Sequence, residues 1–142
     1  MERIRPLDPP HKGLRHGLGQ LSFMLGNTDF RDDNELARLR TLTDEVVTLL
    51  HDHARQEDEF IFAPAERFAP GSPAVDREQH DALHAAVEAI HARISALRPE
   101  TSAGEVDEII RAFRSFHVDY LVHMDHEESI LEPILIAHQT DE

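Results

Sequence analysis

The chain has 142 residues, and its 28 Asp and Glu outnumber its 14 Lys and Arg, which gives a formal net charge of −14 at pH 7. This charge argues against nucleic acids and anionic membranes as partners, because binding to phosphate groups requires clustered Lys and Arg. The sequence has no Cys, so disulfides, thiolate zinc sites, iron–sulfur clusters and a cysteine nucleophile are all excluded.

No apolar run approaches the roughly 18–20 residues that a membrane span needs. The N-terminal segment MERIRPLDPPHKG has no apolar stretch of the signal-peptide type. We therefore expect a soluble, cytoplasmic protein that folds as one domain over residues 1–142, a length that suffices to bury a core.

Four long segments carry apolar residues at helical spacing, and short joints rich in helix breakers separate them. The predicted helices span residues 9–25, 34–62, 73–97 and 103–132. The second predicted helix is followed by Pro64, which can end it. Ser102-x-x-Glu105 is a capping-box pattern at the start of the fourth helix. The fourth helix either ends at Pro133 or continues past a kink there. Since short connections make sequential helices antiparallel neighbours, the sequence predicts an all-α, up-down-up-down antiparallel four-helix bundle.

The sequence has eleven His, which allow a metal site made of nitrogen and oxygen ligands. Successive residues of a helix turn by about 100°, so each His can be assigned to the apolar face or to the opposite one. In the first helix, His11 shares a stripe with Leu14 and Leu18, whereas His16 falls nearly opposite.

The second and fourth helices carry the same motif, 70 residues apart. His53 and Glu57 lie on the apolar stripe of the second helix, and His123 and Glu127 lie at the same offsets on the stripe of the fourth. The third helix places His80 and His84, one turn apart, on its stripe. Antiparallel packing brings these positions and His11 to one level of the bundle.

Buried charges and imidazoles are costly unless they are paired or bound to a metal. For any single His, a structural role is the simpler interpretation. The convergence of five His and two Glu from four helices on one layer favours a metal centre instead. The candidate ligands are His11, His53, Glu57, His80, His84, His123 and Glu127.

Seven such ligands exceed what one tetrahedral zinc ion needs, and they suit two metal ions bridged by the carboxylates. Imidazole and carboxylate in the core of a bundle are a common setting for iron. Two six-coordinate irons with a solvent bridge would leave one position open, and an apolar lining that includes Leu14, Leu50 and Phe116 would admit only small ligands such as O2, NO or peroxide.

The order of these motifs resembles that of the hemerythrin-like (HHE cation-binding) domain. The residues that carry the resemblance are His11 in HKGLR, His53 and Glu57 in HARQE, His80 and His84 in HDALH, and His123 and Glu127 in HMDHEE. It covers nearly the whole chain and implies a four-helix bundle with an oxo- or hydroxo-bridged di-iron centre that binds or senses O2, NO or peroxide. Oxygen carriers of the family usually have Asp five residues after the last His, where this chain has Glu128, so the choice between Glu127 and Glu128 stays open.

Other polar residues receive simpler interpretations. His91 is expected to be a buried structural residue, and Tyr120 is expected to belong to the core. His117 is equally compatible with core packing and with a hydrogen bond to one of the metal-ligating residues. The histidines expected on the surface are His16, His51, His126 and His138.

Three functions are compatible with these residues. The first is binding or sensing of a small oxidant or diatomic ligand, and the second is a di-iron oxidoreductase that consumes peroxide, NO or a small substrate. The third is a bundle that binds zinc or other divalent ions. Whether the protein is an enzyme, which ligand it takes, what donates electrons and how many copies associate are not determined by the sequence.

Overall fold

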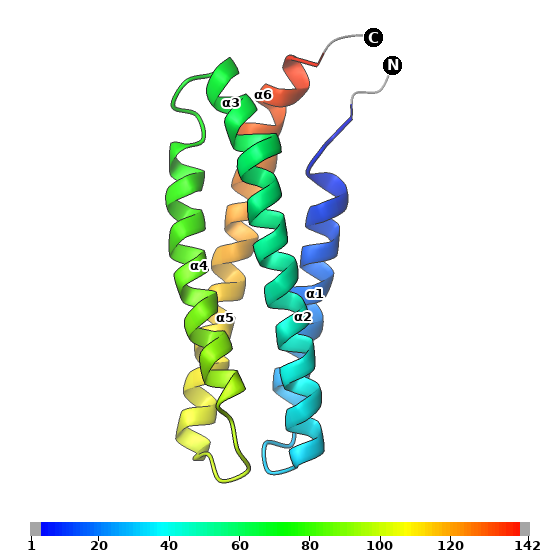
Figure 1. Ribbon diagram of the computed structural model, residues 1–142, viewed down its shortest axis with the longest axis vertical. Helices are drawn as coiled ribbons and strands as arrows, with labels where there is room; N and C mark the ends of the chain where they lie inside the picture. Colours follow the sequence, from blue (N-terminus) through cyan, green and yellow to red (C-terminus); the bar gives the residue numbers. More distant parts are fainter. Residues whose placement is uncertain (1–3, 140–142) are drawn as a thin grey trace.

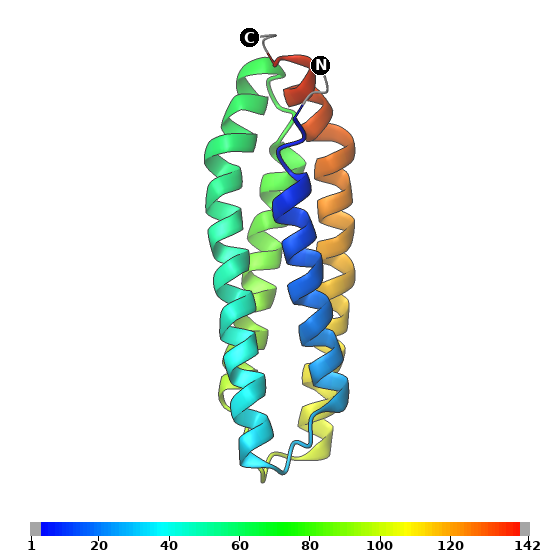
Figure 2. The same ribbon diagram turned by 90° about the vertical axis from the view of Figure 1, so that its right-hand side faces the viewer.

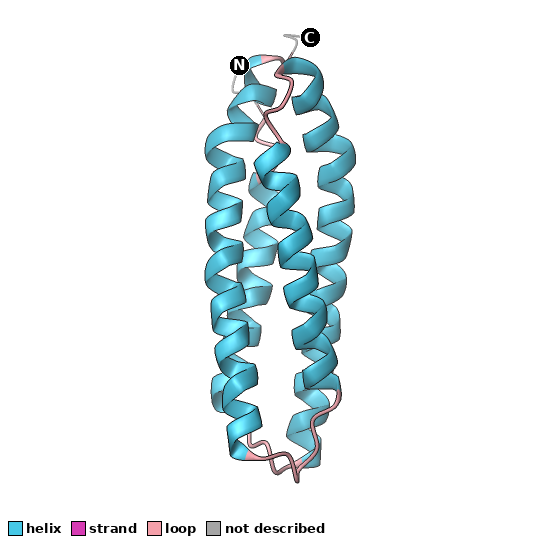
Figure 3. Ribbon diagram, turned by 90° about the vertical axis from the view of Figure 1, so that its left-hand side faces the viewer, coloured by secondary structure: helices cyan, strands magenta, loops and turns pink. Residues whose placement is uncertain are grey.

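The computed structural model describes residues 4–139, and it confirms the predicted all-α four-helix bundle. The four long helices are α1 (Asp8–Asn27), α2 (Asp33–Glu57), α4 (Ala74–Ser95) and α5 (Ala103–His126). They run alternately up and down beside one another, and the loops are confined to the two ends of the bundle (Figures 1 and 3). Residues 4–139 contain no strand, and none of their helices is long and apolar enough to cross a membrane.

Side-chain caps define where two of the long helices begin. The Asp32 side chain accepts hydrogen bonds from the backbone N–H groups of Asn34 and Glu35 at the start of α2. The Ser102 side chain accepts one from Glu105 at the start of α5, as the capping-box pattern predicts. Such caps satisfy amide groups that have no partner within the helix.

The second helix does not end at Phe62 as predicted. It continues through a π-helical turn, η1 (Asp58–Phe62), into the short helix α3 (Ala63–Phe68). The fourth helix continues in the same way through η2 (Glu127–Leu131) into α6 (Glu132–Ala137). Pro64 and Pro133 lie just beyond these turns, and because proline lacks an N–H and clashes with the preceding turn, the wider π-turn lets the chain pass it without stopping.

The apolar core is divided into two clusters. The larger one fills the bundle between the four long helices and includes Leu18, Leu39, Ile94 and Phe113. The smaller one lies where η1, α3, η2 and α6 meet the start of the chain, and its buried members are Leu7, Ile61, Phe62, Ala65, Leu131 and Leu135. Buried polar residues lie between the two clusters, so apolar side chains close this layer from both ends.

The first described residues are tied to the last. The backbone N–H of Leu7 donates to Glu132 Oε2 at 2.9 Å, and the Gln139 side chain donates to the carbonyl oxygen of Ile4 at 2.7 Å. The start of α1 therefore lies beside α6, at the same end of the bundle as the smaller cluster (Figure 2).

Candidate metal centre

Six of the seven predicted ligands meet in the layer between the two apolar clusters. They come from α1, α2, α4, α5 and η2, and all are buried except His80, which is largely buried. They are His11, His53, Glu57, His80, His123 and Glu127.

These six side chains form two groups of four that share both carboxylates. In the first group, His11 Nε2 lies 3.4 Å from Glu57 Oε1 and 3.5 Å from Glu127 Oε1, and His53 Nε2 touches Glu57 Oε1. The potential ligand atoms of this group all lie within 4.8 Å of one another. One cation could therefore be held by two imidazoles and two carboxylates.

The second group has the same composition on the other side of the layer. His80 Nε2 lies 3.3 Å from Glu57 Oε2 and 3.7 Å from Glu127 Oε2, and His123 Nε2 lies 3.2 Å from Glu127 Oε1. Because Glu57 presents one oxygen to each group, it has the arrangement of a carboxylate that bridges two cations.

The layer holds most of the buried side-chain nitrogen and oxygen atoms that lack a hydrogen-bond partner in the described part of the chain. These atoms include the Nε2 of His53, His80 and His123, one oxygen of Glu57 and both oxygens of Glu127. Buried polar atoms almost always have partners, so an accumulation of unpaired ones indicates a missing ligand. Nitrogen and oxygen atoms aimed at a common point are what a divalent transition ion requires.

The protonation states in the layer also suit a metal. Burial lowers the pKa of His53 to about 4 and that of His123 to about 3, so both imidazoles are neutral near pH 7. Burial alone would raise the pKa of Glu57, but the hydrogen bond with His11, the close contact with His80 and the charge of His53 outweigh it and lower the pKa to about 2. Neutral imidazole and ionised carboxylate are the forms that bind metal ions.

Comparison with known families agrees with this geometry. The hemerythrin HHE cation binding domain matches residues 3–139, which is nearly the whole chain. The chain belongs to this family. No curated protein and no solved structure matches it. Membership implies that this hemerythrin domain binds cations, typically iron, and the buried layer supplies groups that can hold them.

One histidine of the hemerythrin domain is oriented from behind by a hydrogen bond, and a second has a carboxylate behind it. His123 Nδ1 lies 2.8 Å from Gln79 Oε1, and since an amide oxygen only accepts, Nδ1 donates and Nε2 keeps its lone pair toward the layer. His11 Nδ1 lies 3.6 Å from Glu128 Oε1. The role of Gln79 could not be predicted from the sequence, because contacts between helices depend on their packing and not on spacing along one helix.

Glu128 takes a position different from that of Glu127. Glu127 is fully buried in the layer, whereas Glu128 is half-buried and accepts two hydrogen bonds from Arg15, at 3.0 and 2.6 Å. The hydrogen bond with Arg15 holds the pKa of Glu128 below its usual value. Glu128 is therefore held by Arg15 behind His11 and outside the layer, while Glu127 lies within it.

We expect Gln79→Met to weaken metal binding by about 10–100-fold, the usual cost of losing a group that orients a ligating histidine. Methionine keeps the length of the side chain but cannot accept the hydrogen bond from His123. The affinity for Zn2+ or Fe2+ would be measured by competition with a chromophoric chelator. The matched control is Glu78→Met, at the exposed neighbouring position, and equal affinities of the two variants would contradict the assignment.

His84 departs from its predicted position. It was expected on the inner face of α4, one turn after His80, but its side chain is exposed and lies outside the layer. Its ring centroid lies 4.8 Å from that of His51. A helical wheel gives the direction of the Cα–Cβ bond only, and at the edge of an apolar stripe a long side chain can turn to either side.

The remaining histidines are less uniform than predicted. His16 is exposed, as expected, but His51 and His126 are half-buried, and His126 Nδ1 lies 2.7 Å from Oδ1 of Asp76, which is fully buried. His91, expected to be buried, is half-buried and lies 2.7 Å from Asp44. Asp76, which no sequence motif indicates, joins the start of α4 to the end of α5 through its carboxylate.

Tyr120 and His117 lie on the inner side of α5. Tyr120 is buried in the apolar core, as expected, and its ring centroid is 5.9 Å from that of His123. Burial and the charge of Glu57 raise the pKa of its hydroxyl, which therefore keeps its proton. His117 is half-buried against Phe113, and burial lowers its pKa.

Two hollows adjoin the layer along the seam between α2 and α4. A cavity of about 30 Å3 is lined by residues that include His51, His80, His84 and Tyr120. This volume exceeds the roughly 10–15 Å3 that a single water occupies on this measure. Farther out, a depression of about 450 Å3 is lined by His80, His84 and the acidic residues Asp58 and Asp81, together with Arg77 and Ala54.

Proposed function

We propose that this hemerythrin domain is a non-haem di-iron protein that binds or senses a small oxidant or diatomic ligand, O2, NO or peroxide. The observation that carries the proposal is the pair of carboxylates, Glu57 and Glu127, shared by two groups of buried imidazoles. Two such groups suit two cations, and imidazole with carboxylate in a bundle core suits iron. Bound iron would supply redox chemistry and an open coordination position.

The proposed ligands are the six residues of the layer together with His84. His11 and His53 would serve one ion, and His80, His123 and His84 the other, with Glu57 and Glu127 between them. His84 would turn inward from its position beside His51, and it already lines the cavity that also touches His80. The group with His11 and His53 would then contribute fewer protein ligands than the group with His80, His123 and His84, which would leave room for a small molecule beside His11 and His53.

The surroundings support a small ligand. The larger apolar cluster closes one side of the layer and the smaller cluster closes the other. Only a molecule of a few atoms could reach the ions without separating the helices. The same walls exclude bulk water and strengthen the electrostatic interactions within the layer.

A di-iron oxidoreductase is the second candidate, and the position of Tyr120 favours it. Its ring lies against His123 and lines the cavity beside His80, so a protonated hydroxyl is available near the layer. Because its pKa is raised, this hydroxyl keeps its proton and could donate a hydrogen bond to the reacting molecule in an enzyme that consumes peroxide or NO.

Metal analysis combined with optical spectroscopy tests both candidates. We expect the protein purified from iron-replete cells to contain about two iron ions per chain. A visible absorption band that appears when the reduced protein meets O2 or NO, and disappears when the gas is removed, would support binding. Irreversible oxidation with loss of peroxide or NO would support the oxidoreductase, and zinc without iron would contradict both.

A further inference from the structure

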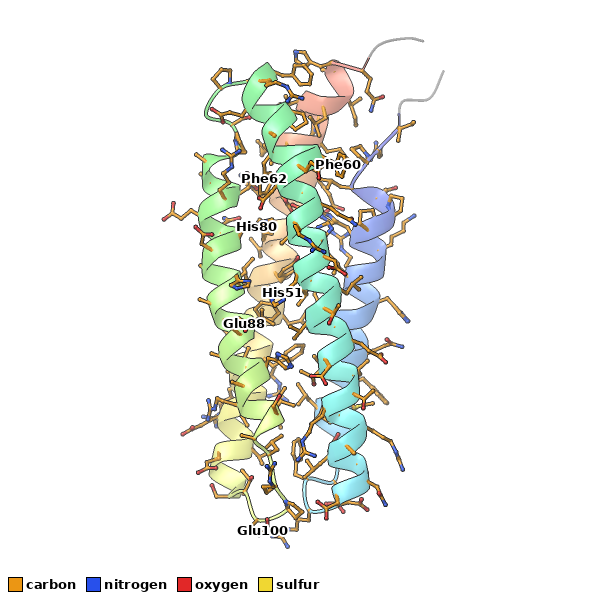
Figure 4. All side chains as sticks on the ribbon, in the orientation of Figure 1. His51, Phe60, Phe62, His80, Glu88 and Glu100 are labelled. Carbon is orange, nitrogen blue, oxygen red and sulfur yellow. The ribbon has the colours of Figure 1, made fainter. Side chains whose placement is uncertain are left out.

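A second group of potential ligands lies outside the layer, on the seam between α2 and α4. It consists of His51 from α2 and of His84 and Glu88 from α4, and their ligand atoms lie within 4.8 Å of one another. His51 Nε2 is 2.9 Å from Glu88 Oε1, and the two imidazole rings are 4.8 Å apart between centroids. Figure 4 shows His51 and Glu88 at this seam, farther along the bundle than His80.

The contacts within this group do not satisfy its polar atoms. His51 Nε2 is buried and makes no hydrogen bond, although Glu88 Oε1 is within hydrogen-bond distance. A surface ion pair would normally align donor with acceptor, whereas two imidazoles and a carboxylate around a common point are a ligand set for a divalent transition ion. His84 and Glu88 are exposed, which would leave further coordination positions to water and allow rapid exchange.

The outer group is connected to the inner layer. His51, His84 and His80 line the same cavity of about 30 Å3. His84 and His80 also line the depression outside it, where Asp58 and Asp81 provide negative charge. His84 and His80 therefore border both hollows, with acidic side chains and Arg77 beside them.

We propose that His51, His84 and Glu88 form a loading site that captures a divalent iron ion and delivers it to the inner layer. His84 is shared between the two positions: it holds the ion beside His51 and Glu88 and then turns inward with it toward His80. Binding of an ion at the outer site depends only on these three side chains, whereas delivery of that ion to the inner layer rests on the function proposed above. The net charge of −14 favours the arrival of cations, and the outer group gives them a specific place to bind.

The test uses His51→Gln and Glu88→Gln, which change the outer group but none of the proposed inner ligands. His91→Gln is the matched control, because His91 and Asp44 make a histidine–carboxylate pair across the same two helices without a third ligand. Metal-free protein would be titrated with Zn2+ by calorimetry and loaded with Co2+, whose visible absorption reports coordination, in a stopped-flow instrument.

Because His84 can serve the outer or the inner position but not both at once, wild-type protein and the His91→Gln control are expected to hold the outer ion only transiently, as an early change in Co2+ absorption before the inner layer fills. His51→Gln and Glu88→Gln should lose that early change and fill the inner layer about tenfold more slowly at low Co2+ concentration. Their final inner occupancy should equal that of wild type. An early change and loading rates unchanged from wild type in both variants would overturn the proposal.

A further variant, Glu57→Gln, separates this proposal from the proposed function. If Glu57→Gln still binds one Zn2+ ion, and adding His51→Gln to it removes that ion, the outer site is supported even though the inner layer is disabled. If wild-type protein binds only that outer ion, the di-iron function and delivery both fail. If wild-type protein fills the inner layer without the early change, and Glu57→Gln binds no ion at the outer group, the loading site alone is wrong.

Discussion

Glu57→Gln is expected to remove most of the bound iron, because Glu57 presents an oxygen to each of the two groups of imidazoles. Glutamine has nearly the same shape but carries no charge and offers a single acceptor oxygen. The loss of affinity should exceed about 100-fold, which is the upper range for groups that only orient a ligand. Iron content after gel filtration and calorimetric titration of the metal-free protein would measure it.

The same variant should be less stable in the presence of iron. A metal that binds only the folded chain stabilises it, so a 100-fold loss of affinity costs about 2.7 kcal/mol of unfolding free energy at saturating metal. The control is His16→Ala, whose side chain is exposed on the same end of the bundle as His11 but on the opposite face of α1. A Glu57→Gln protein that retains the iron content and melting temperature of His16→Ala would contradict the assignment of the layer.

The metal-free protein is expected to lose stability as the pH falls from 6.5 toward 4. Burial lowers the pKa of His53 to about 4 and of His123 to about 3, whereas both are near 6.5 in the unfolded chain. Between these values the unfolded state binds protons that the folded state does not, so stability rises with pH across this window and is complete above it. Each histidine contributes a slope of about 1.4 kcal/mol per pH unit.

Urea denaturation of the metal-free protein at several pH values would measure this slope. His123→Gln should reduce the slope relative to wild type, because one of the two imidazoles to which the slope is assigned is gone. Below pH 4.5 a further decrease is expected, since Glu57, with its lowered pKa of about 2, stabilises the fold only while it is ionised. An unfolding free energy that is constant from pH 6.5 to 4.5 would contradict the neutral state assigned to these histidines.

The bundle and most of the layer could be predicted because both follow from helical periodicity. His53 with Glu57, and His123 with Glu127, continue apolar stripes, and a stripe in a bundle must face the core. His80 and His11 follow by the same reasoning, since antiparallel packing aligns their heights. The structure accordingly brings all six to one layer.

What the sequence did not predict depends on side-chain rotamers and on contacts between helices. His84 lies at the edge of its stripe, where the choice between inside and outside is decided by neighbours such as His51 on another helix. Gln79 behind His123, and Arg15 beside Glu128, are likewise partners across helices. The passage of the chain beyond Pro64 was missed because a proline usually ends a helix, whereas here a π-turn accommodates it.

The two π-turns make the helix ends sensitive to chain length. In a regular α-helix, Phe60 would share the face of Glu57, yet it is 63% exposed while Phe62 is fully buried, and the two lie on opposite sides of the helix (Figure 4). Ile130 and Glu132 repeat this relation after Glu127, with Ile130 47% exposed and Glu132 buried. Each turn thus acts as a one-residue insertion that resets the rotational phase of the helix. Deleting one residue within a turn would restore a regular α-helical turn with Phe62 four residues after Glu57, so the smaller cluster would stay inside. Adding a further residue would rotate that cluster outward by about 100°, a change that substitution at the same positions cannot reproduce.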